Sequence, residues 1–237
     1  MNYFSDKTEW LLLTSAIAVA TVGFLSHYYL STSGSIISLL KTEKGKPICV
    51  LYQRLLGVVI FGFLPLVVIF LSGTKKLSDF GVVWPDSESY FWTMILSLVI
   101  VPVTYFNSRT KENLKMYPQI REKEWSIGML IMSAVSWIGY LLAYEFLFRG
   151  FLFFAALPVL GLFFAIVLNT IIYALVHLHK GFKEISGSVP LGILLCYLTF
   201  KTGNIWVAVF THIVLALSSE WFSVWAHPNM VVKTNRL

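Results

Sequence analysis

The chain contains a succession of apolar stretches, most of them long enough to cross a lipid bilayer as a helix. A helix of about 20 apolar residues spans the roughly 30 Å hydrocarbon layer. We identify seven such stretches, at about 10–30, 50–73, 89–106, 128–156, 158–178, 188–200 and 204–226. The sequence therefore predicts an all-α, multi-pass transmembrane bundle of about seven to eight helices, which we expect in the cell membrane.

Composition excludes an ordinary soluble domain. The 237 residues are 57% hydrophobic and 13% charged, against roughly 25% charged residues in an average soluble domain. The net charge of +6 does not indicate nucleic-acid binding, because the basic residues are spread over short loops, where membrane proteins use them for orientation. The connections are short, so we expect one membrane domain, 1–237, with N-terminal spans in 1–106 and a motif-bearing part in 125–226.

Three local features carry structural expectations. The fourth span is long and the sixth is short, which predicts a tilt, an extra partial helix, or a break at Gly139 or Gly150. The polar stretch 107–124 predicts a loop with a short interfacial helix that ends before Pro118. Arg54, near the start of the second span, is expected to extend its charge to the membrane surface. The first three spans offer no recognisable chemistry.

Glu145 is the main acidic residue placed inside an apolar stretch. Ionisable groups within a bilayer are costly, so each needs a partner or a function. Arg149 follows Glu145 by four residues, which puts both on one helix face. This pattern fits either a structural ion pair or part of a reactive site.

Three histidines favour the second alternative. His177 ends the fifth span, His179 follows two residues later, and His212 lies within the seventh span. A two-residue step turns a helix by about 200°, so His177 and His179 cannot share a face. We expect His177 to point inward and His179 to lie in the turn.

These residues resemble the motifs of the CAAX-protease and bacteriocin-processing (CPBP, or Abi) family of intramembrane proteases. That family carries Glu-Glu-x-x-x-Arg-Gly, then an aromatic residue with x-x-x-His, then His-x-x-x-Asn or Asp. The corresponding segments here are Tyr144-Glu145-Phe146-Leu147-Phe148-Arg149-Gly150, Tyr173-Ala174-Leu175-Val176-His177, and His212-Ile213-Val214-Leu215-Ala216. The resemblance covers roughly residues 140–220, in the order of the family.

Two positions depart from the family pattern. Tyr144 replaces the first glutamate, usually assigned to water activation, and Ala216 replaces the Asn that is thought to help stabilise the oxyanion. A branch of the family has an aromatic residue before a single glutamate, a His-x-His-Lys turn and a downstream Glu. His177-Leu178-His179-Lys180 and Glu184 are similar to that arrangement, which favours a divergent, active member.

The resemblance implies a metal-free glutamate protease that cleaves a membrane-embedded or lipidated peptide without a cofactor. Glu145 is expected to act as general base with help from His177, while His212 donates to the oxyanion and Arg149 holds Glu145. Glu184 is a second candidate base, or else a solvated loop acid beside Lys180 and Lys183. A zinc site on Glu145, His177 and His212 is the metal alternative, although no His-Glu-x-x-His motif is present.

Two other functions remain open at this point. An inactive family member would use the same residues as a structural network or a partner-binding pocket, and Tyr144 and Ala216 favour it. A small transporter or proton relay would also use buried Glu and His. That alternative predicts an internal repeat between the two halves, and the sequence shows none.

Overall fold

The protein is represented by a computed structural model that describes residues 3–176 and 182–233, with the side chains of 3–6 and 182–185 outside the description. The elements are α1 (Tyr3–Thr32), α2 (Gly34–Leu39), α3 (Pro47–Gly57), η1 (Val58–Phe63), α4 (Leu64–Ser72), η2 (Leu77–Phe80), α5 (Ser87–Asn107), α6 (Lys111–Met116), β1 (Glu124–Ser126), α7 (Ile127–Glu145), η3 (Phe146–Leu152), α8 (Phe153–Leu175), α9 (Phe182–Thr202), α10 (Trp206–Ala226) and β2 (Val231–Lys233).

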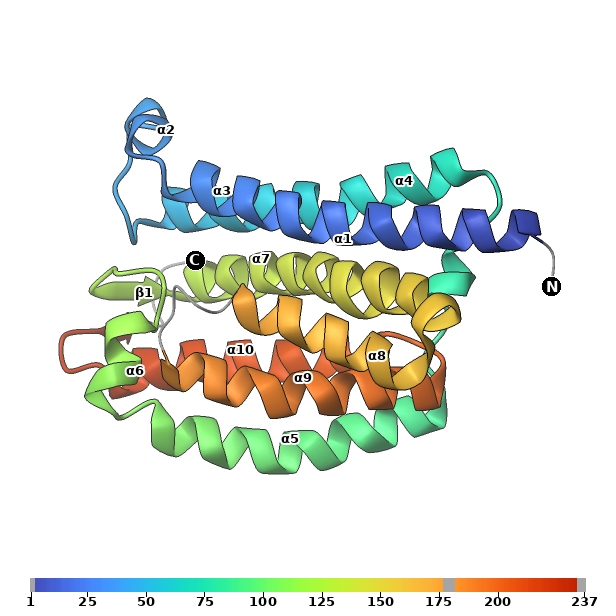
Figure 1. The fold of residues 1–237 in the computed structure, drawn as a ribbon. Helices are drawn as coiled ribbons and strands as arrows, with labels where there is room; N and C mark the ends of the chain where they lie inside the picture. Colours follow the sequence, from blue (N-terminus) through green and yellow to red (C-terminus); the bar gives the residue numbers. More distant parts are fainter. Residues whose placement is uncertain (1–2, 177–181, 234–237) are drawn as a thin grey trace.

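The long helices form layers that run side by side (Figure 1). α1 packs with α3 and α4 on one side, α7 and α8 lie in the middle, and α5, α9 and α10 form the other side. Among the described residues, five helical segments are long and apolar enough to cross a membrane. The predicted all-α, multi-pass membrane bundle is confirmed.

The fourth and fifth predicted spans are joined in one 49-residue helical segment, Ile127–Leu175. The chain turns back inside α8 at Gly161, whose φ of 73° and ψ of 169° lie outside the helical region. Glycine adopts positive φ without the steric penalty of a side chain. The suggested break at Gly139 or Gly150 was therefore wrong in position, because the helix continues through both of them. The predicted sixth span lies within the longer helix α9, which is not one of the five candidate membrane segments among the described residues.

Short polar side chains start several helices. Asp86 accepts a hydrogen bond from the Ser89 backbone N–H at the start of α5, and Ser126 accepts one from Met129 at the start of α7. Such caps satisfy backbone donors that a helix leaves unpaired at its N-terminus. The short helix predicted within 107–124 is α6, which ends before Pro118; its place at a membrane interface stays a prediction. β1 and β2 form a small parallel pair.

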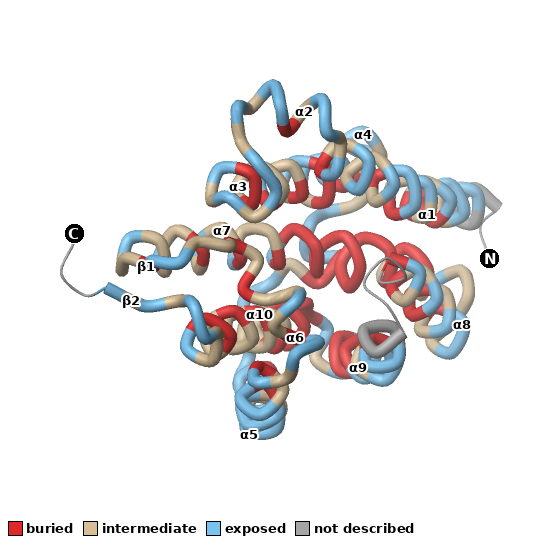
Figure 2. The backbone as a smooth tube through the Cα atoms, turned by 90° about the vertical axis from the view of Figure 1, so that its left-hand side faces the viewer, coloured by how far each residue is buried: buried red, intermediate tan, exposed pale blue. Residues whose placement is uncertain are grey.

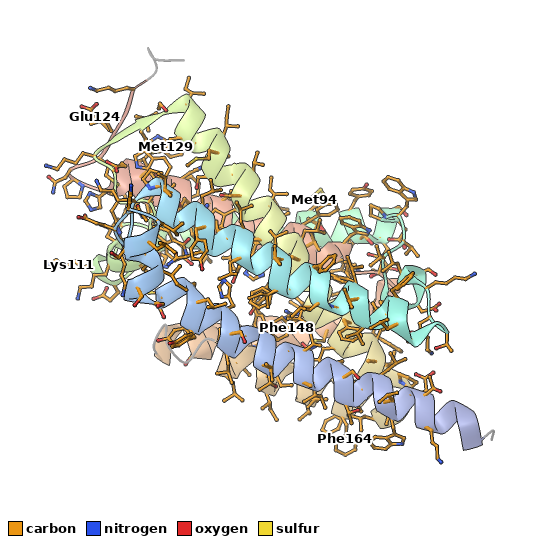
Figure 3. The ribbon with its side chains drawn as sticks, turned by 90° about the horizontal axis from the view of Figure 1, so that it is seen from above. Met94, Lys111, Glu124, Met129, Phe148 and Phe164 are labelled. Carbon is orange, nitrogen blue, oxygen red and sulfur yellow. The ribbon has the colours of Figure 1, made fainter. Side chains whose placement is uncertain are left out.

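Burial is concentrated where α7 passes into η3. Figure 2 shows this part of the chain as continuously buried, whereas α5 and the outer faces of α1 and α8 are largely exposed. Phe148 lies in the middle of the bundle beneath α1 and the α3–α4 helix (Figure 3), and its side chain is fully buried. Phe164, at the outer edge, is 61% exposed. Exposed apolar side chains of this kind suit contact with lipid.

Arg54 does not reach the membrane surface, so that expectation was wrong. Its side chain is only 3% exposed, and its Nη2 lies 3.4 Å from Oε1 of Glu220, a fully buried residue of α10. Nη1 donates to the Ser133 carbonyl at 3.0 Å and to Ser136 Oγ at 2.8 Å. A guanidinium with several donors stays inside when acceptors from other helices surround it.

Candidate active site

Glu145 ends α7 at the centre of the bundle, and Arg149 follows one turn later in η3. Both side chains are fully buried, and Arg149 Nη1 lies 3.0 Å from Glu145 Oε2. The guanidinium carbon of Arg149 also lies 4.2 Å from the centre of the Tyr173 ring on α8. A buried carboxylate is tolerated only with a counter-charge of this kind.

His212 reaches the same carboxylate from α10. Its Nδ1 lies 2.6 Å from Glu145 Oε1. Both carboxylate oxygens of Glu145 are therefore occupied, one by Arg149 and the other by His212. A carboxylate that contacts one ring nitrogen of a histidine fixes the tautomer and the orientation of the imidazole.

The backbone around Arg149 forms a π-helix, η3, in which the regular α-helical hydrogen bonds are shifted by one residue. Asn169 supports it from α8, because its Nδ2 donates to the Phe148 carbonyl at 2.6 Å. The Asn169 Oδ1 accepts from Cys196 Sγ of α9 at 3.2 Å. Sequence reasoning missed Asn169, although an amide inside an apolar stretch is itself a signal of a buried polar partner.

A cavity of about 520 Å³ lies beside this cluster. His212 lines it, but Glu145 and Arg149 do not. Much of one wall consists of aromatic side chains of α7 spaced about one turn apart, namely Trp137, Tyr140 and Tyr144. The rest of the lining includes polar side chains such as His27, Gln53 and Arg54, and a cavity that combines apolar walls with polar groups can bind a ligand.

The two positions that depart from the family pattern both line the cavity. Tyr144 lies edge-on to His212, with ring centres 5.7 Å apart. Its hydroxyl is buried and has no hydrogen-bond partner within the described part of the chain. Ala216 packs with Trp137 and Leu141, so its methyl group presents no donor to the cavity.

Three predicted site residues lie outside the described residues. These are His177, His179 and the side chain of Glu184. Their expected roles, and the zinc alternative that uses His177, stay predictions. Of the described residues, no three His, Cys, Asp or Glu side chains are grouped as a metal site would require.

Comparison with models of protein families found a match to the part of the chain that contains this cluster. Residues 118–218 match the family described as "Type II CAAX prenyl endopeptidase Rce1-like". This segment is similar to the Rce1-like family. It includes Glu145, Arg149 and His212, and it confirms the predicted resemblance to the CPBP family. The comparisons with curated proteins and with solved structures gave no match.

Proposed function

We propose that the protein is an intramembrane endopeptidase that hydrolyses a peptide bond of a membrane-embedded or lipidated substrate at the Glu145–His212 pair. The observation that carries this proposal is the 2.6 Å contact between Glu145 Oε1 and His212 Nδ1 at the wall of the cavity. The similarity to the Rce1-like family supports a protease in general terms.

The geometry favours a different division of roles from the one expected from the motifs. Both oxygens of Glu145 are engaged and the residue does not line the cavity, whereas His212 does. In the neutral imidazole, an Nδ1–H donated to Glu145 leaves Nε2 as a proton acceptor. We therefore assign His212 as the general base and Glu145 as the carboxylate that orients it.

In this scheme, His212 Nε2 takes a proton from a water molecule as the water oxygen attacks the scissile carbonyl carbon. The negative carboxylate of Glu145 stabilises the imidazolium that forms, and Arg149 balances the buried charge of Glu145. The carbon–nitrogen bond then breaks, and His212 returns the proton to the leaving amine. His212 no longer supplies the oxyanion donation expected from the sequence.

The cavity suits a peptide that reaches it from the membrane. It lies among helices long enough to span a bilayer, and its lining is mainly aromatic and aliphatic. The family description makes a prenylated peptide the first substrate to test. We place the protein in the cell membrane.

The test uses purified protein in liposomes with a fluorogenic farnesylated peptide that ends in Cys and three further residues. Wild-type protein should cleave it, and Glu145→Gln and His212→Gln should each lower the rate at least about 100-fold. Glu43→Gln is the matched control, because Glu43 is exposed in the α2–α3 loop. Full activity of Glu145→Gln would contradict the proposal. Since we propose no cofactor, a chelator should leave the rate unchanged; inhibition that zinc reverses would support the metal alternative.

A second candidate is a binding protein without turnover. Tyr144 stands where the family has its water-activating glutamate, and the remaining carboxylate is fully engaged. In the same assay this candidate predicts that the farnesylated peptide binds to wild-type protein and is recovered intact.

A further inference from the structure

His27 brings a third imidazole to the cavity, from a helix whose sequence suggested no chemistry. It lies in α1, half-buried, and lines the same cavity as His212. Its ring centre is 4.9 Å from that of Phe61 and 5.9 Å from that of Tyr140. The imidazole is therefore held between aromatic rings of two other helical segments.

The hydrogen bond of His27 defines its protonation pattern. Nε2 lies 2.9 Å from the Gln53 backbone oxygen, and a carbonyl oxygen only accepts hydrogen bonds. Nε2 therefore carries the proton, and in the neutral ring Nδ1 is an acceptor. No described residue makes a hydrogen bond to Nδ1.

Gly57 permits this arrangement. A Cβ added at Gly57 would lie 2.3 Å from Tyr140 Cε2 and 3.3 Å from His27 Nε2. The first distance is far shorter than any van der Waals contact, and both atoms belong to rings packed against other side chains. A side chain at position 57 would push Tyr140 out of place, so the glycine is what lets the two rings converge.

A row of aromatic rings links His27 to the proposed active site. His27 contacts Tyr140, Tyr140 stacks on Tyr144 at 5.9 Å, and Tyr144 lies 5.7 Å from His212. Three steps of under 6 Å separate the two imidazoles. An extended peptide advances about 3.3 Å per residue, so the two imidazoles lie within about five residues of each other along a bound strand.

We infer that His27 Nδ1 accepts a hydrogen bond from one backbone N–H of the peptide substrate, within about five residues of the scissile bond. The inference rests on the proposed peptidase function. A peptide drawn into a mainly apolar cavity loses water from its N–H groups, and each one left unpaired weakens binding. His27 offers a fixed acceptor for one of them and makes α1 part of substrate recognition.

The experiment is a scan of the farnesylated peptide in which each N–H near the scissile bond is replaced in turn by an ester oxygen. With wild-type protein, replacement at one position should lower kcat/KM by roughly 3- to 10-fold. His27→Phe keeps the ring stack but removes the acceptor, so the same replacement should then have no effect. His27→Gln can both donate to Gln53 and accept, and it should retain the position-specific loss.

The controls separate this inference from the proposed function. His227→Phe makes the same substitution at a histidine outside the cavity lining and should preserve the wild-type profile. Cleavage by wild-type protein with a position-specific loss that survives His27→Phe would overturn the assignment, as would a scan without any such position. Absence of cleavage by wild-type protein would instead contradict the proposed function.

Discussion

Glu145 and His212 lie 67 residues apart in the sequence, and Glu145 Oε1 is 2.6 Å from His212 Nδ1. The contact joins the end of α7 to the middle of α10, and Arg149 Nη1 at 3.0 Å completes the environment of the carboxylate. The three groups form a fully packed unit of which His212 alone lines the cavity. This arrangement suits an oriented base next to a substrate-sized space.

Arg149→Met should destabilise the protein strongly, because it leaves the buried carboxylate of Glu145 without a counter-charge. Breaking a buried ion pair on one side typically costs about 3–5 kcal/mol. The double variant Glu145→Gln/Arg149→Met should recover part of this loss, since neither charge is then buried. The stabilities of the variants are compared by thermal unfolding with a thiol-reactive dye. Both cysteines are buried in the folded protein, so the dye reacts with them only as the protein unfolds. A double variant no more stable than Arg149→Met would contradict the ion-pair account.

Asn169→Leu should lower kcat at least about 10-fold, with KM changed much less. The leucine removes the hydrogen bond to the Phe148 carbonyl and leaves the π-helix beside Arg149 unsupported. Thr170→Val is the matched control, since the Thr170 hydroxyl is buried without a hydrogen-bond partner in the described residues. Equal losses of kcat in the two variants would assign Asn169 a general packing role.

Gly57→Ala should displace Tyr140 and lower both stability and activity, because the new methyl group would lie 2.3 Å from the ring. Overpacking of this kind costs about 1–3 kcal/mol. Gly139→Ala adds the same methyl group where it would meet Val58 at an ordinary 3.6 Å, so it should behave as wild type. Unfolding temperature and cleavage rate compare the two variants, and similar behaviour would argue against the role assigned to Gly57.

The long elements and the local ion pair were predictable because their signals are local. An apolar run of sufficient length specifies a membrane helix, and the spacing of Glu145 and Arg149 puts them on one face. His212 was identified through the family motifs and their order, whereas its contact with Glu145 depends on how α7 and α10 pack. Asn169 was overlooked because its partners, a carbonyl in η3 and a thiol in α9, exist only after folding.

The turn within α8 and the burial of Arg54 could not be predicted from neighbouring residues in the sequence. Several glycines lie in apolar stretches, and only the packed structure determines that Gly161 takes positive φ. Arg54 stands near the start of a span, where extension to the surface is the usual outcome. Its partner Glu220 is 166 residues away, so neither the pair nor its burial could be seen from neighbouring residues.

Arg54→Lys should reduce stability while leaving kcat within about 3-fold of wild type. The planar guanidinium donates at once to Ser133, Ser136 and Gln119 and lies 3.4 Å from Glu220 Oε1. The single ammonium group of lysine cannot make the same set of hydrogen bonds as the planar guanidinium. Acceptors from α7, α10 and the α6–β1 loop would therefore lose their partner. None of these groups contacts Glu145 or His212 in the described structure, so we expect kcat to hold. KM can change, because Arg54 and Gln119 line the cavity. The exposed Arg109→Lys is the control and should unfold at the wild-type temperature. A large fall in kcat with unchanged unfolding temperature would instead place Arg54 in the reaction itself.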